Sequence, residues 1–276
     1  MSLAAQDLIP QLAGWVGNLD DVFPGKQVKP YFAQWEVAHI LSLIVLGGSS
    51  ILLNLRLMGV GITDEPTSEV HRNLRGWIWI GVLGMLVTGL MIGSANAERL
   101  YTSEAFTAKM VGLVAGIILT FGVTLPTAKA DGVMNGGSRV ASVAGLAVFA
   151  LALWVFLSAK LSNPGLWHVI TAGALVALYA TRKTIRIVYG ALLAALIIAQ
   201  QYVTHVVYKF DDYASLDPAN KAFAWAFVAL VLGAFTVQAV TSGRAERGGA
   251  FVRLMALAAL LVWVMTAAAG RWLAFA

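Results

Sequence analysis

Long apolar runs separated by short polar stretches make up most of the chain from residue 37 onward. An α-helix needs about 20 apolar residues to cross a hydrocarbon layer about 30 Å thick, and most of the runs approach that length. Strict alternation of apolar and polar residues, which is typical of a membrane barrel, is absent. The pattern therefore predicts an all-α, polytopic membrane bundle of about eight transmembrane helices. They are expected at residues 37–57, 76–93, 106–125, 140–159, 166–181, 185–207, 221–241 and 252–273.

The fifth of these runs, residues 166–181, is short, and it turns into the sixth through the sequence TRKT. Burying Arg182 and Lys183 in the middle of a bilayer would cost several kcal/mol. We therefore expect a short helix whose cations reach the membrane surface, and not a hairpin that stops inside the bilayer.

The composition agrees with a membrane protein, because 59% of the residues are hydrophobic and only 12% are charged. A soluble domain carries about 25% charged residues. No linker or low-complexity stretch divides the chain, so residues 36–276 are predicted to form a single transmembrane bundle. Residues 1–35 carry no cleavable signal pattern, and they are predicted to be a periplasmic tail whose LIPQLAGWVGNL stretch can lie in the membrane interface.

The cationic residues are unevenly distributed between the two sets of loops. One set carries 11 of the 19 Lys and Arg residues and a net charge of +6, whereas the other carries −1. It comprises residues 56–75, 126–139, 182–186 and 242–253. The positive-inside rule makes these loops cytoplasmic and both termini periplasmic, which places the protein in a bacterial inner membrane. No basic run is present, so nucleic acid is not an expected partner.

Cysteine is absent from the sequence. This excludes thiolate metal sites, iron–sulfur clusters and covalently attached c-type haem. The chain also lacks the P-loop, Rossmann, HExxH and GxSxG motifs, so no enzyme class is indicated. A bound metal would have to be held by His, Met, Lys, Tyr or carboxylate side chains.

Three of the four histidines are predicted about one helical turn below the same outer surface. They are His39 in the first span, His168 in the fifth and His205 in the sixth, whereas His71 is placed in the first cytoplasmic loop. Lys109 lies one turn into the third span from the same side. An ionisable residue inside a membrane needs a partner, which makes each of these residues a candidate for function.

Three interpretations of this cluster remain open. The imidazoles and Lys109 could satisfy neighbouring polar groups and bind nothing. Alternatively, His39 and His205 could be the metal ligands of a b-type haem, with His168 or Lys109 as further candidates for the second axial position. As a third possibility, a histidine of the cluster with Met110 or another soft ligand could pass copper, because imidazole and thioether both suit that metal.

A resemblance to known membrane proteins rests on three stretches of the chain. These are HILSLIVLGGSSILLNLRLMGVG, RGWIWIGVLGMLVTGLMIGS and YTSEAFTAKMVGLVAG, and together they cover about residues 30–125. They resemble an uncharacterised family of bacterial inner-membrane proteins with an early His in the first span and Phe-x-x-Lys at the start of the third. Asn54 stands where that family usually has Asp.

More distantly, the layout is similar to the HemJ-type protoporphyrinogen oxidases and the CopD-type copper-resistance membrane proteins. The likeness implies haem-site roles for His39 and Lys109, and it matches Arg56 to the arginine that ends the first span. We therefore predict a haem-binding electron-transfer subunit that links a periplasmic redox partner and the quinone pool. The alternatives are a copper-transport or homeostasis protein and a structural subunit of a larger membrane complex.

Overall fold

The computed structural model describes residues 3–158, 165–208, 213–241 and 244–273, and these residues form helices and turns without any strand. The long helices are α4 (Phe32–Leu57), α5 (Thr67–Ala95), α7 (Glu104–Ile117), α9 (Gly136–Ser158), α10 (Gly165–Ala180), α11 (Lys183–Tyr202), α12 (Tyr213–Thr241) and α13 (Arg244–Trp272). Short helices precede and connect them. These are α1 (Ala5–Leu8), η1 (Pro10–Leu12), α2 (Ala13–Val16), α3 (Gly25–Val28), η2 (Lys29–Tyr31), α6 (Ala97–Tyr101) and α8 (Leu125–Lys129).

Seven helical stretches within the described residues are long and apolar enough to cross a membrane. They are Gly25–Leu57, Thr67–Ala95, Glu104–Lys129, Gly136–Ser158, Thr184–Val207, Ser215–Gln238 and Gly249–Arg271. Each coincides with one of the predicted runs, which confirms a multi-pass helical membrane protein. The remaining predicted run is the short one, and its described apolar helix covers only Thr171–Ala180.

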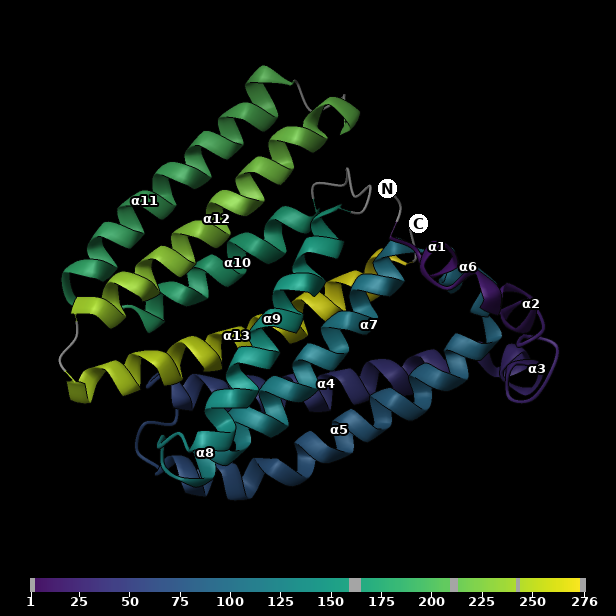
Figure 1. The fold of residues 1–276 in the computed structure, drawn as a ribbon, viewed down its shortest axis with the longest axis horizontal. Coiled ribbons are helices and arrows are strands. Elements are labelled where there is room, and N and C mark those ends of the chain that lie inside the picture. The colour runs from purple at the N-terminus through teal and green to yellow at the C-terminus, as the bar shows by residue number, and fades with distance from the viewer. Residues whose placement is uncertain (1–2, 159–164, 209–212, 242–243, 274–276) are drawn as a thin grey trace.

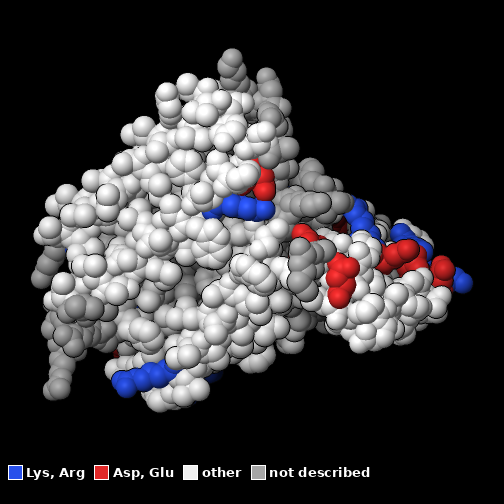
Figure 2. All heavy atoms as spheres, turned by 45° about the horizontal axis from the view of Figure 1, so that its top comes forward, with Lys and Arg blue, Asp and Glu red and all other residues white. Residues whose placement is uncertain are grey.

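Both termini lie at the same end of the bundle, next to the short helices α1 and α6 (Figure 1). We call this the terminal end, and we call the opposite end, where α4 turns into α5, the loop end. Charged side chains gather mainly toward the terminal end in Figure 2, whereas most of the remaining surface in view is uncharged. That distribution is expected of helices whose sides face lipid.

Local hydrogen bonds explain why α4 stops and α5 starts at the loop end. Gly59 has φ +77, and its N–H donates to the Arg56 carbonyl, while the Val60 N–H donates to the Leu55 carbonyl. These are the two bonds of a Schellman motif, which requires a residue with positive φ. At the start of α5, the Asp131 carboxylate accepts a 2.8 Å hydrogen bond from the Ser68 N–H and so caps the helix.

One sequence expectation about this end of α5 is wrong. His71 was expected in a cytoplasmic loop, but it lies within α5 and is only 8% exposed. The apolar run predicted a start near residue 76, whereas the helix begins at Thr67 because Pro66 and the cap from Asp131 start it earlier.

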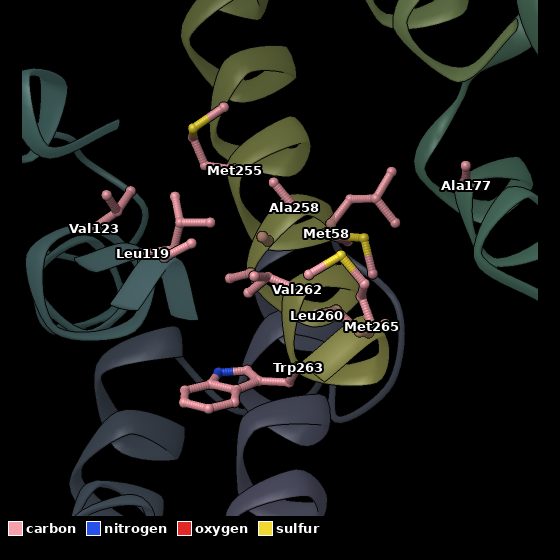
Figure 3. Close-up of a cluster of buried hydrophobic side chains, with 14 of the residues drawn as sticks. Met58, Leu119, Val123, Ala177, Met255, Ala258, Leu260, Val262, Trp263 and Met265 are labelled. Carbon is pink, nitrogen blue, oxygen red and sulfur yellow. The ribbon is translucent and has the colours of Figure 1, made fainter. Parts of the chain in front are cut away.

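Helix α13 forms the centre of the bundle, because 72% of its apolar stretch is buried. Figure 3 shows buried side chains of α13, among them Val262 and Trp263, together with Met58, Leu119, Val123 and Ala177 from other parts of the chain. The Trp263 Nε1–H donates to Thr120 Oγ1 at 2.9 Å, and the ring lies against Gly116, where a Cβ would be 2.9 Å from the ring. Gly112 meets Thr266 and Met265 in the same way. The GxxxG pair of α7 therefore serves packing inside the monomer.

Helices α10, α11 and α12 form a layer on the other side of α13 from the α4–α5 pair (Figure 1). Arg186 joins α10 to α11, since its guanidinium donates to the carbonyls of Thr181 and Tyr179. Arg182 and Arg186 are exposed, whereas the side chain of Lys183 lies outside the described residues. The apolar stretch of α12 is only 17% buried, so most of this layer faces outward.

Candidate functional site

His39 lies two turns into α4 and is held by the neighbouring helix α5. Its Nδ1 is 2.7 Å from Thr88 Oγ1, and the Thr88 hydroxyl is itself 2.6 Å from the Gly84 carbonyl. A hydroxyl has one proton, and the carbonyl can only accept, so Thr88 donates to Gly84 and accepts from the imidazole. His39 therefore carries its proton on Nδ1, and its Nε2 keeps a free lone pair.

A glycine of α5 makes room for this imidazole. The position that a Cβ would take at Gly89 lies 3.3 Å from Cε1 of His39. Such a contact is tighter than usual, so the missing side chain lets the ring lie directly on the α5 backbone. The ring is fixed both by a hydrogen bond and by packing, with Nδ1 committed to Thr88. The Nδ1 of His39 is thus bound to a neighbouring acceptor, as is common for histidines that ligate metals.

Lys109 of α7 lies close enough to His39 for the two to interact electrostatically. It is half-buried, and its side chain runs along the last turn of α13. A Cβ at Gly270 would be 3.5 Å from the Cδ, Cε and Nζ atoms of Lys109. The C-terminal end of a helix carries partial negative charge, which favours a cation at this place. The structure thus brings His39, Thr88 and Lys109 together near the terminal end.

The structure does not bring His205 to this site. His205 lies in the π-helical segment η4 (Val203–Val207), where it is exposed, and its Nε2 is 3.1 Å from Oε1 of Gln201 on the same helix. The main packing partners of α11 are α10 and α12, and Figure 1 shows its η4 end well away from α4. His168 belongs to α10, but its side chain lies outside the described residues.

Arg56 is also remote from His39. It lies 17 residues further along α4, which corresponds to about 25 Å at a helical rise of 1.5 Å per residue. Its Nε donates to the Glu65 carbonyl at 2.7 Å and so holds the connection between α4 and α5. Arg56 has a structural contact at the loop end, at the opposite end of the helix from the imidazole.

Three acidic residues, Asp211, Asp212 and Asp217, follow His205 along the chain. Asp211 and Asp212 lie outside the described residues. Asp217 lies in α12, and one of its carboxylate oxygens forms an ion pair with Lys221 at 2.8 Å. Its charge is therefore partly compensated locally.

Thr88 is the site residue that the sequence did not reveal. It stands in the apolar run LVTGL, and a single threonine in such a run usually bonds to its own helix. Only the pairing of α4 with α5 shows that its hydroxyl also accepts a hydrogen bond from His39. No group of three or more His, Asp or Glu side chains suited to a metal ion is found among the described residues.

Comparison with protein families gives one match. The model of a family of unknown function, DUF6644, matches residues 15–170, which include His39, Thr88 and Lys109 but not His205 or α13. The comparisons with curated proteins and with solved structures gave no match. The predicted membership of an uncharacterised membrane family is confirmed in this form, whereas the resemblance to HemJ-type and CopD-type proteins gains no support.

Proposed function

Because the chain belongs to DUF6644, a family of unknown function, its activity must be argued from its own site, and we propose that it holds a b-type haem through His39 and transfers electrons. The observation that carries this proposal is the hydrogen bond from His39 Nδ1 to Thr88. Histidine ligands of metals characteristically donate their second ring N–H to a neighbouring acceptor, which fixes the ring and its tautomer. In His39 this leaves Nε2 as the ligand atom.

The residues around the site indicate one haem ligand, His39, more clearly than they indicate the second. We take Lys109 as the first candidate for the second axial position, because it lies toward the terminal end and its charge reaches His39. An amine binds a metal only after losing its proton, so this ligation would depend on pH. His205, which the sequence favoured, would have to come from a helix that packs on α10 and α12.

A bound haem would supply one-electron chemistry, and the protein residues would set its position. Thr88 would hold the proton on His39 Nδ1, and the apolar sides of α4, α5 and α7 would keep water away from the site. Because His39 and Lys109 lie near the terminal end, we propose that the redox partner approaches from that side. The quinone pool of the same membrane is the second exchange partner in this proposal.

The proposed topology has eight spans with both termini in the periplasm, α10 being the additional span. It is supported by the excess of Lys and Arg in the loops of the loop end. A reporter that is active only in the periplasm should work when fused after Ala276. A cytoplasmic reporter should work when inserted between residues 131 and 136, and the reverse pattern would contradict this topology.

The haem proposal is tested by the absorption spectrum of the full chain, purified after expression with ample haem. A Soret band and split α/β bands on reduction are expected. The Lys109→Ala variant should keep haem but show a changed spectrum, because one axial position would become free. A wild-type protein that shows no haem bands after haem-supplemented expression would overturn the proposal.

A copper function is favoured less by the site. Met110 follows Lys109, but no group of three or more His, Asp or Glu side chains that could hold a metal ion is found among the described residues. Copper binding by the purified protein in place of haem would identify that alternative. A protein that binds neither would be left with a structural role in a membrane complex.

A further inference from the structure

The segment before α4, residues 3–31, exposes many large apolar side chains. Phe23 is 74% exposed and Trp15 is 63% exposed. The set comprises Leu8, Ile9, Leu12, Trp15, Val22, Phe23 and Tyr31. Leu8, Leu12 and Trp15 lie in the successive short helices α1, η1 and α2.

This segment is fixed to the bundle and not a loose tail. The Tyr101 hydroxyl donates to the Ile9 carbonyl, and the Leu3 N–H donates to Glu104 Oε1 at 3.0 Å. Val16 packs with Tyr101 and Ala97 in a small buried cluster of its own. The exposed apolar side chains are therefore held on a rigid support, which we call the N-terminal platform (residues 3–31).

A close contact shows that the platform rests on the end of α5. Gly25 lies so near Ser94 that a Cβ would be 2.8 Å from the Ser94 carbonyl oxygen. The depth of this contact follows from the bond between His39 and Thr88, which puts those two residues at the same level. Ser94 lies six residues beyond Thr88, so the platform begins about 9 Å outward from His39.

The edge of the apolar layer can be placed on the same scale. The apolar run of α4 begins at Val37, two residues or about 3 Å outward from His39. The platform therefore starts about 6 Å outside the apolar edge. Since a bilayer is about 40 to 45 Å thick with its headgroups and about 30 Å without them, each headgroup layer is about 5 to 8 Å thick. The contact between Gly25 and Ser94 falls within that layer.

The charges of the platform are largely compensated. The Lys29 ammonium donates to an Asp20 carboxylate oxygen at 2.7 Å and lies 3.7 Å from Asp21. This hydrogen bond holds the pKa of Asp20 below its usual value. With Asp7 and Lys26 added, the segment has a net charge of only −1. Electrostatic attraction to an anionic surface would therefore contribute little, and apolar contact would dominate.

We propose that the N-terminal platform is a fixed anchor in the lipid headgroup layer at the terminal end, with Leu12, Trp15 and Phe23 inserted between lipid molecules. Aromatic and apolar side chains on a segment at this depth are typical of interfacial membrane contacts. The exposed residues continue through Tyr31 into Val37, where the outward side of α4 begins to face lipid. This inference rests on the membrane spans alone and is independent of haem.

The absence of cysteine allows a direct test, because a single introduced cysteine carries the only label. Leu12→Cys, Trp15→Cys and Phe23→Cys would each be spin-labelled in the full chain, in nanodiscs of zwitterionic lipid. Asp21→Cys and Lys26→Cys, which replace exposed polar residues of the same segment, serve as matched controls. Accessibility to oxygen and to a water-soluble nickel complex reports the depth of each label.

For the labels at residues 12, 15 and 23, the ratio of oxygen accessibility to nickel accessibility should be at least threefold higher than for the two controls. The difference should persist in 1 M salt, since it does not depend on charge. If the labels at 15 and 23 are as accessible to nickel as those at 21 and 26, the platform faces water and its apolar side chains serve a protein partner. Because three positions are tested in separate variants, the test still holds if one variant fails to fold.

Discussion

Two helix pairs of this bundle cross the membrane with different internal chemistry. The α4–α5 pair packs closely enough that a Cβ at Gly81 would come within 2.6 Å of the Leu46 backbone nitrogen. The α11–α12 pair belongs to the outer layer, and Gly233 of α12 has no atom within 4 Å of its Cβ position. His39 of the first pair bonds to Thr88 of the neighbouring helix, and His205 at the end of the second pair bonds to Gln201 of its own helix.

This difference shows that the depth of a histidine in the membrane does not by itself define a binding site. In the sequence, His39 and His205 look equivalent, because each lies near the outer end of an apolar run. In the structure, His39 bonds to Thr88 of α5, whereas His205 bonds to Gln201 four residues earlier on its own helix. A functional side chain is recognised by what the neighbouring helix offers it.

The largest expected effect is on haem binding by the two histidines. His39→Ala should abolish the haem bands, because the ligand nitrogen is lost, while the protein still inserts into the membrane. His205→Ala should keep the full haem content and reduced spectrum. The measurement is the haem-to-protein ratio of the purified variants. Equal loss of haem in both variants would contradict the difference between the two helix pairs. It would favour His39 and His205 as the two haem ligands.

A smaller effect is expected when only the support of His39 is changed. Thr88→Val removes the acceptor for the Nδ1 proton while keeping the shape of the side chain, so haem affinity should fall by about 10- to 100-fold. Thr88→Ser keeps the hydroxyl and serves as the matched control. Haem titration of the apoprotein measures both affinities, and a shifted midpoint potential in Thr88→Val would separate this role from mere packing. Identical haem affinities and midpoint potentials in Thr88→Val and Thr88→Ser would contradict the role of Thr88.

Hydrophobic length was enough to predict most of the spans. The run at residues 37–57, for example, falls within α4, and the run that starts at residue 140 follows α9 to its end at Ser158. Which helices pack against each other could not be predicted in the same way. A side chain that faces lipid and one that faces another helix are both apolar. The central place of α13 therefore follows from shape, such as the fit of Trp263 against Gly116, and not from hydropathy.

The candidate site was predictable only in part. The sequence identified His39 and Lys109, because ionisable residues inside an apolar run stand out. It could not identify Thr88, whose importance depends on the register of α5 against α4. It also could not show that α11, the helix before His205, packs mainly on α10 and α12.

The contrast between the two pairs also predicts different responses to added side chains. Gly81→Ala should lower the free energy of unfolding by about 1 to 3 kcal/mol, because the new methyl group meets the α4 backbone, which cannot move aside. Gly233→Ala should change it by no more than about 1 kcal/mol, since its position is open. Unfolding of both variants in the same nanodiscs measures the difference. A cost for Gly233→Ala equal to that of Gly81→Ala would show that the outer layer is as tightly packed as the α4–α5 pair.

The smallest effect concerns the loop end of α5, where Asp131 caps the helix outside the membrane. The hydrogen bond from the Ser68 N–H holds the pKa of Asp131 below its usual value of 3.8. A carboxyl group with a lowered pKa in the folded state stabilises the fold above its unfolded pKa, and the contribution disappears as the pH falls through the folded pKa. Asp131→Asn should therefore melt slightly below the wild type at pH 7, and the two melting temperatures should converge below pH 3.8.

Asp64→Asn in the preceding loop serves as the control for that comparison, because it removes a carboxylate from the same end of the bundle without touching the start of α5. Melting temperatures measured between pH 3 and pH 7 should show convergence for Asp131→Asn and no such trend for Asp64→Asn. A gap between wild type and Asp131→Asn that is as large at pH 3 as at pH 7 would mean that geometry alone, and not the carboxylate charge at the helix N-terminus, accounts for the cap.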